Sequence, residues 1–155
     1  MMTRIARFWL PAFLLLWTGA AAPAAQGEKK ISMKTAPPAV REAFEKQFPQ
    51  ARVLGVSEEK APDGMLYEVE SEWRGRHYDV TYKSSGALVS VEETIPMAEV
   101  PPAVAAALKK EFPSAKVVRA EKITEGGVLS YEFQLKGGPK KEAKFSAEGK
   151  LLASE

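Results

Sequence analysis

The chain has 155 residues, enough for one or two small domains, and it contains no cysteine. The composition therefore excludes disulfides, a cysteine nucleophile, cysteine ligands for zinc and a lipid-modified cysteine anchor. The 22 basic residues outnumber the 20 acidic ones only because of Arg4 and Arg7, which lie in a segment expected to be removed. A neutral remainder gives no electrostatic reason to expect binding to nucleic acid or to an anionic membrane.

The first 25 residues have the order of a secretory signal peptide. Arg4 and Arg7 precede an apolar run over residues 8–22, and small residues follow that run. The run is shorter than the ~20 apolar residues that a membrane-spanning helix needs. We therefore expect cleavage near Ala24 or Ala25, a periplasmic or secreted protein, and no membrane span in the mature chain. An uncleaved anchor is the alternative.

One stretch of the sequence occurs twice. Residues 37–56 align without a gap with residues 101–120, at an offset of 64, and half of the aligned positions are identical. Self-similarity of this kind indicates a fold built of two like units. We divide the chain into a signal peptide (1–25), a flexible tether (26–35), repeat 1 (36–97) and repeat 2 (98–155).

Each repeat is expected to begin with an amphipathic helix. In repeat 1, Val40, Phe44 and Phe48 share one helical face, and Pro49 ends the segment. The helix of repeat 2 is expected to run from about residue 102 to residue 112, because its apolar side chains recur with the same spacing.

Four strands are expected after each helix, because apolar and polar side chains alternate between turn sequences. They span residues 52–60, 66–73, 76–83 and 87–94 in repeat 1, and residues 116–124, 129–136, 141–146 and 150–154 in repeat 2. The fold class is therefore α+β, with two tandem repeats that each pack one helix on a four-stranded antiparallel sheet. Joining the two sheets at their edges would remove exposed edge strands.

Several motifs recur in both repeats: Pro-x-x-Val, then Phe-Pro-x-Ala, then an alternating Tyr-Glu strand and a Gly-x-Leu ending. Their residues are Pro38, Val40, Phe48, Pro49, Ala51, Tyr67, Glu68, Val69, Tyr82, Gly86 and Leu88 in repeat 1, and Pro102, Val104, Phe112, Pro113, Ala115, Tyr131, Glu132, Phe133, Phe145, Gly149 and Leu151 in repeat 2. This pattern resembles the PepSY-like domain family, which is related in architecture to tandem-repeat β-lactamase inhibitor proteins. The resemblance implies an exported, non-catalytic binding module.

The sequence offers little for catalysis. His77 is the only histidine, so a serine triad would depend on it, and no nucleophile motif lies nearby. The Gly-Gly pairs lie in hairpins rather than at helix starts, where a phosphate loop would place them. With no His or Cys cluster for zinc, we expect no enzyme activity, no cofactor and no dedicated metal ligand.

A candidate surface lies on the second and third strands of repeat 1. A two-residue turn at Arg74 and Gly75 would pair residue 73 with 76, 72 with 77, 70 with 79 and 68 with 81. The carboxylates of this hairpin would then form a ridge on its solvent-facing side, where like charges oppose each other. The six candidate partner-binding residues are Glu68, Glu70, Glu72, Trp73, His77 and Asp79.

The ridge can be interpreted in three ways. A lysine-bearing partner would offset the opposed charges, and so would a divalent cation held by oxygen ligands. A solvated strand face is the third alternative. We predict an exported, non-catalytic binding protein that engages a protein or peptide partner in the cell envelope through the open face of its sheet, with inhibition as one form of that activity. The alternative function is an envelope protein that binds or senses cations through the ridge.

Overall fold

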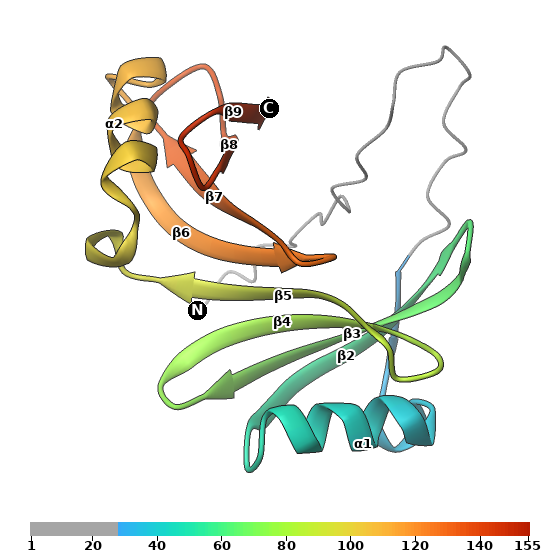
Figure 1. Ribbon diagram of the computed structural model, residues 1–155. Helices are drawn as coiled ribbons and strands as arrows, with labels where there is room; N and C mark the ends of the chain where they lie inside the picture. The colour runs from blue at the N-terminus through green and yellow to red at the C-terminus, as the bar shows by residue number, and fades with distance from the viewer. Residues whose placement is uncertain (1–27) are drawn as a thin grey trace, which may run out of the picture.

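The computed structural model describes residues 28–155 (Figure 1), so the expected signal peptide and the first two residues of the expected tether lie outside the described part. Within that part, the strands form one antiparallel sheet whose spatial order follows the chain from β1 to β9. The predicted α+β class is confirmed. The predicted four-stranded sheet in each repeat is corrected to a single nine-stranded sheet, because the last strand of repeat 1 pairs with the first strand of repeat 2.

The helices and strands follow the repeat order. The expected tether contains β1 (Lys29–Ile31) and the short 3-10 helix η1 (Met33–Thr35). Repeat 1 contains α1 (Pro38–Gln47), β2 (Arg52–Ala61), β3 (Gly64–Trp73), β4 (Arg76–Lys83) and β5 (Leu88–Ile95). The 3-10 helix η2 (Met97–Glu99) lies across the boundary between the repeats. Repeat 2 continues with α2 (Pro102–Glu111), β6 (Lys116–Glu125), β7 (Val128–Lys136), β8 (Glu142–Ser146) and β9 (Leu151–Ser154).

The segment expected to be a tether is ordered over β1 and η1. β1 pairs with β2, with Ile31 opposite Val56, and Ile31 packs against the core under α1. At the repeat offset of 64, the equivalent of Ile31 is Ile95, the last residue of β5, which lies opposite Ala120 on β6. The segment 29–35 is short and mostly polar, so its sequence shows no periodicity. It nevertheless supplies the partner strand that the outer edge of β2 would otherwise lack.

Each helix covers one half of the sheet. Val40 and Phe44 of α1 are buried against Val69 and Val80, and Val104 and Leu108 of α2 are buried against Phe133 and neighbouring side chains. Val91 packs against the first cluster and Ile95 belongs to the second. These two residues point to the same side of β5, because they are four positions apart on one strand. Both helices therefore lie on the same face of the sheet.

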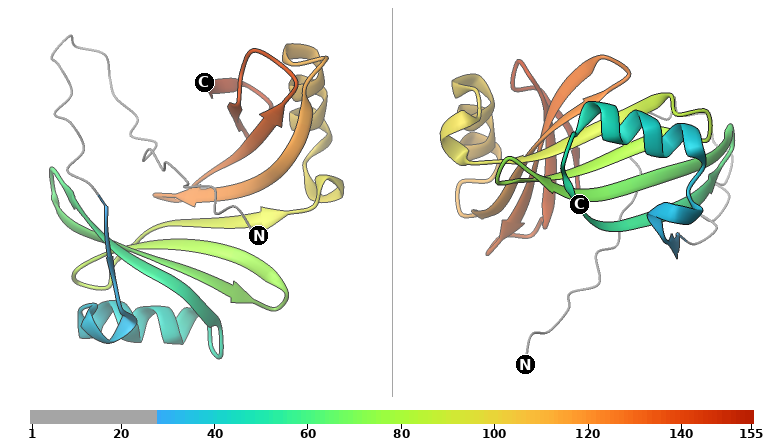
Figure 2. Two further views of the ribbon diagram at one scale, coloured as in Figure 1. Left: turned by 180° about the vertical axis from the view of Figure 1, so that it is seen from behind. Right: turned by 90° about the horizontal axis from the view of Figure 1, so that it is seen from below.

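The sheet is strongly bent between its two halves. Figure 1 and Figure 2 show α1 and α2 on its outer side, while the inner side carries no helix in the described part of the chain. The bend folds the inner faces of the two halves toward each other. We call the inner side the helix-free face.

Ion pairs on the outer face connect the repeats at the bend. The carboxylate of Glu93 on β5 accepts a hydrogen bond from Arg76 of β4 (2.6 Å) and forms an ion pair with Lys122 of β6 (2.5 Å). The guanidinium group of Arg76 also donates two hydrogen bonds to the carboxylate of Glu99 in η2. Burial opposes ionisation of Glu93, but its hydrogen bonds with Lys122 and Arg76 outweigh burial and lower its pKa. The β5–β6 junction is therefore held by charge-assisted bonds as well as by the strand ladder.

Among the described residues, we find no helix that is both long and apolar enough to cross a membrane.

Candidate functional site

The helix-free face carries acidic side chains on five adjacent strands, β3 to β7. Asp79 on β4 lies directly opposite Glu92 on β5, and Glu121 on β6 lies directly opposite Glu132 on β7. Glu92 and Glu121 share this face because Thr94, two residues after Glu92, is the partner of Glu121. We call the set the carboxylate row: Glu68, Asp79, Glu92, Glu121 and Glu132.

The centre of the carboxylate row is buried. Asp79 and Glu121 are each 3% exposed, and Glu92 is 8% exposed. No helix covers this face in the described part of the chain. Acidic residues are almost never buried to this degree unless they are paired, so the row is an unusual feature of the molecule.

Burial changes the acidity of the row. Burial, together with the nearby carboxylates of Glu121, Glu132, Asp79 and Glu68, raises the pKa of Glu92 to about 9. Burial and the hydrogen-bonded carboxyl group of Glu142 raise the pKa of Glu132 to about 8, against the opposing effect of Lys144. Both groups are therefore largely protonated at neutral pH.

Basic side chains lie at both ends of the row. Nε2 of His77 is 3.3 Å from Oδ1 of Asp79 and 3.6 Å from Oε1 of Glu70. At the other end, Nε of Arg119 is 3.2 Å from Oε1 of Glu121, and Lys144 lies opposite Glu132. The charges that act on Glu92, in the middle, are those of carboxylates.

The hairpin register predicted for the candidate residues is confirmed. Residue 73 is opposite 76, 72 opposite 77, 70 opposite 79 and 68 opposite 81. Five of the six candidates lie on the helix-free face: Glu68, Glu70, Glu72, His77 and Asp79. Asp79 is buried there, although the alternation predicted a solvated side chain.

Two candidates are placed apart from the row. Glu72, near the end of the hairpin, forms an ion pair with Arg52, in which a guanidinium nitrogen lies 2.5 Å from Oε2 of Glu72. Trp73 lies on the outer face, where its indole N–H donates to the carbonyl oxygen of Pro49 (3.0 Å) and its ring meets Phe48 at 5.4 Å. Trp73 thus closes the core under α1 and does not share the surface of the carboxylates.

The sequence reasoning missed three of the five residues of the row. Glu92, Glu121 and Glu132 come from the end of repeat 1 and from repeat 2, so they join the first repeat's acids only through the β5–β6 pairing. One signal was present, because Glu132 aligns with Glu68 at the repeat offset of 64. Glu92 and Glu121 have no such signal, and their placement follows from the joined sheet.

One group on this face could hold a metal ion. Donor atoms of Glu70, His77 and Asp79 lie within 4.8 Å of one another. Imidazole and carboxylate are ligands that suit zinc and other divalent transition metals. The arrangement could therefore supply three of the four ligands that such an ion takes.

The architecture defines a class of proteins in which two helix-on-sheet repeats share one bent sheet. The sequence profile of the beta-lactamase-inhibitor-like, PepSY-like family matches residues 25–90 and again residues 66–153. The chain belongs to this family, and the resemblance stated from its motifs is confirmed.

Solved structures share the fold at low sequence identity. A BLIP-like protein from Bacteroides fragilis is 21% identical, with a TM-score of 0.61 over 77% of this chain and 85% of that chain. A protein named as periplasmic from Bacteroides eggerthii is 22% identical, with a TM-score of 0.65 over 77% of this chain and 88% of that one. A DUF2874 family protein from Bacteroides uniformis is 21% identical, with a TM-score of 0.65 over 77% of this chain and 88% of that one. No curated protein matches the chain.

Proposed function

We propose that this protein is an exported, non-catalytic binding protein whose helix-free face holds a basic segment of a protein or peptide partner in the cell envelope. The observation that carries the proposal is Glu92, which is 8% exposed in the middle of a row of carboxylates. A folded chain gains no stability from such an arrangement, because burial and like charge both oppose ionisation. A lysine or arginine side chain in the row would supply the missing opposite charge.

Membership of the family supports the non-catalytic and inhibitor-like parts of the proposal. The order of the first 25 residues supports export, and the Bacteroides eggerthii neighbour named as periplasmic agrees with that location. Inhibition of the partner is one outcome of such binding, since a segment held in the bent sheet is withdrawn from other contacts.

The test is capture from a cell-envelope extract with three forms of the purified protein. The Glu68→Gln/Glu132→Gln variant removes two carboxyl groups from the row and keeps the size of the side chains. The Glu42→Gln/Glu45→Gln variant removes two exposed carboxylates from α1, on the outer side, and serves as the control. We expect the first variant to lose the partner, most strongly at low salt, and the control to keep it. Equal capture by all three forms would contradict the proposal.

A second candidate function rests on the group formed by Glu70, His77 and Asp79. Their donor atoms lie close enough to share one ion. A cation there would also offset the opposition of Glu70 and Asp79 across β3 and β4. The corresponding function is cation binding or cation sensing in the envelope.

Zn²⁺ and Ca²⁺ titrations with a thermal unfolding readout test this second candidate. An ion that binds the folded chain raises the melting temperature with concentration. We expect the rise to disappear in His77→Gln if the group is the site. A melting temperature unaffected by either ion would remove this candidate and leave the first in place.

A further inference from the structure

The donor atoms of Glu70, His77 and Asp79 have the spacing that a transition-metal ion requires. Nε2 of His77 lies 3.3 Å from Oδ1 of Asp79 and 3.6 Å from Oε1 of Glu70. Two ligand atoms of a tetrahedral zinc ion, each about 2.0–2.1 Å from the metal, lie roughly 3.3–3.4 Å apart. The imidazole nitrogen is therefore already close to the required distance from both carboxylates. Calcium and magnesium take oxygen ligands, so an imidazole between two carboxylates favours a transition metal.

This group is buried on one side and open on the other. Asp79 is 3% exposed, whereas the side chains of His77 and Glu70 are 23% and 40% exposed. Gly55 of β2 lies directly opposite Glu70. Among the described residues other than its chain neighbours, only Glu70 lies within 4 Å of the point where a Cβ of Gly55 would stand. The glycine thus leaves space beside the group, which allows an ion to enter together with a water molecule as the fourth ligand.

Repeat 2 carries a fixed positive charge at the corresponding place. At the repeat offset of 64, Arg119 stands where repeat 1 has Gly55, and Gln134 takes the place of Glu70. Arg119 and Gln134 lie directly opposite each other, as their counterparts do. Nε of Arg119 is 3.2 Å from Oε1 of Glu121, so a guanidinium group meets the acidic side chains of this half of the face. Repeat 1 has a glycine and a further carboxyl group there, an arrangement that a bound cation complements.

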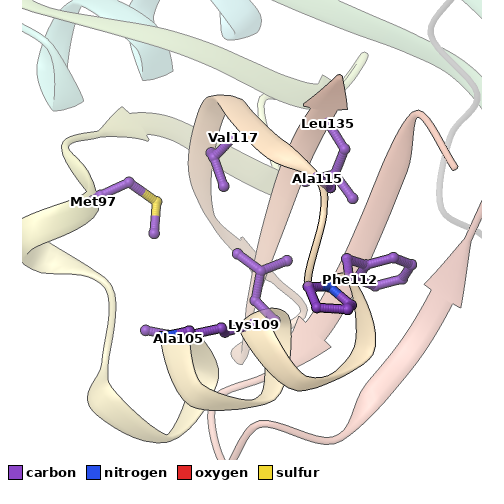
Figure 3. A pocket seen from close by; sticks show the side chains of 9 residues that line it. Met97, Ala105, Lys109, Phe112, Ala115, Val117 and Leu135 are labelled. Carbon is purple, nitrogen blue, oxygen red and sulfur yellow. The ribbon is translucent and has the colours of Figure 1, made fainter. Parts of the chain in front are cut away.

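The hollow beside α2, on the outer face, offers no comparable donors. It has a volume of about 260 Å³, and its lining consists of apolar side chains and Lys109 (Figure 3). With no carboxylate or imidazole in that lining, the hollow does not suit a divalent cation. Within residues 28–155, the group on the helix-free face is the one that brings three such donor atoms together.

Asp79 belongs both to this group and to the carboxylate row. In the row it lies directly opposite Glu92, which is at the centre. A divalent ion held between Glu70 and Asp79 would balance the charges of both carboxylates. It would also withdraw Asp79 from a basic side chain in the row. Two ligands that depend on the same carboxylate oppose each other, and each weakens the other by the same factor.

We propose that Glu70, His77 and Asp79 bind a divalent transition-metal ion, and that the bound ion weakens the binding of a basic segment to the carboxylate row. This inference rests on the proposed function, because the row must bind a basic segment for the ion to regulate it. The metal-free protein is then the form that holds the partner, and the metal-loaded protein is the form that releases it.

The test measures the affinity of a hexalysine peptide for the chelator-treated protein by calorimetry at low salt, alone, with ZnCl₂ and with CaCl₂ at equal ionic strength. We expect zinc to weaken peptide binding by about fivefold or more, within the range typical of coupled sites. Calcium controls for screening by a divalent ion and should have little effect. Titration of zinc with and without the peptide should give the same factor.

Two variants locate the effect. His77→Gln removes the imidazole, so the ratio of the peptide affinities without and with zinc should fall to about one. Gly55→Arg introduces the arginine of repeat 2, so it should weaken the peptide even without zinc and abolish the zinc response. Gly55→Gln adds a long side chain without the charge, and it should bind the peptide without zinc as the parent does. Gly55→Arg also keeps the test decisive should His77→Gln fail to fold.

Equal peptide affinity with and without zinc would overturn this inference and leave the proposed function in place. A zinc effect that persists in His77→Gln, or an equal effect of calcium, would overturn it too, because the ion would then act elsewhere or by screening. Failure of hexalysine to bind the metal-free protein would contradict the proposed function and this inference together.

Discussion

At the scale of single residues, Glu92 is the side chain whose ionisation opposes folding most clearly. Its pKa is raised to about 9, and that of Glu132 to about 8, while an unfolded glutamate titrates near 4.3. The folded chain therefore holds more protons than the unfolded chain between about pH 4.5 and pH 9, and stability falls as the pH rises through that window. The ionisable groups around Glu92 on this face include Glu68, Glu70, His77, Asp79, Arg119, Glu121, Glu132, Glu142 and Lys144.

Glu92→Gln should remove part of this loss. The amide stays neutral, so we expect the variant to exceed the parent in stability at pH 8 and to be close to it at pH 5. Each unit of pKa difference corresponds to about 1.4 kcal/mol, so the gain at pH 8 should be at least of that order. Urea unfolding at the two pH values measures it. A gain of the same size at both would show that the effect is not electrostatic.

The two phenylalanines that follow the helices should differ in their contribution to stability. Phe48→Ala should cost about 3–5 kcal/mol, because the ring is buried among three other rings. Phe112→Ala should cost less, about 1–3 kcal/mol, because Phe112 is only half-buried. Thermal or urea unfolding provides the comparison. The motif alone predicts equal costs, and equal measured costs would mean that Phe112 is covered as fully as Phe48.

At the scale of the elements, the hairpins could be predicted from the sequence and the edges could not. Alternation and the turn at Arg74 and Gly75 determine the β3–β4 register, since both are local. β1 has three residues and no periodicity, so only its alignment with the end of β5 points to a strand.

The positions that are identical in the two repeats are packing positions. Gly86 and Gly149 have positive φ and lie against Ala39 and Ala103, where a Cβ would come within 2.5 and 2.7 Å of the carbonyl oxygens.

The β5–β6 junction should depend on Glu93. Glu93→Ala leaves Arg76 and Lys122 without their shared partner, and hydrogen bonds to charged groups are worth about 1.5–3 kcal/mol. We expect a loss of about that size in the free energy of unfolding. Faster hydrogen exchange at β5 and β6 than at the outer strands would locate the effect. Uniform exchange changes would show that the junction is not a separate point of weakness.

At the scale of the whole molecule, the sequence predicts which residues lie on each face of the two half-sheets, but not how the half-sheets are arranged relative to each other. Alternation assigns Asp79 to the polar side, and nothing in the residues around it indicates that this side chain is buried. Glu92 and Glu121 come together through the pairing of β5 with β6. The sequence suggests that the two sheets could join at their edges, but it does not predict the register of that pairing. The carboxylate row is therefore a property of the joined sheet.

Export should leave a protein that begins near residue 25 or 26. The basic start, the apolar run and the small residues that follow it predict cleavage there. N-terminal sequencing of the protein recovered from the cell envelope measures the position. Recovery of an intact Met1 in the membrane fraction would indicate an uncleaved anchor instead.

The most direct test of the proposed binding face is an NMR titration of the protein with a hexalysine peptide at low salt. If the helix-free face holds basic segments, the largest shift changes should lie at the backbone amides of Glu68, Glu92, Glu121 and Glu132, and they should shrink in the Glu68→Gln/Glu132→Gln variant. Shift changes centred on the exposed carboxylates of α1, Glu42 and Glu45, or unchanged by that variant, would contradict the account.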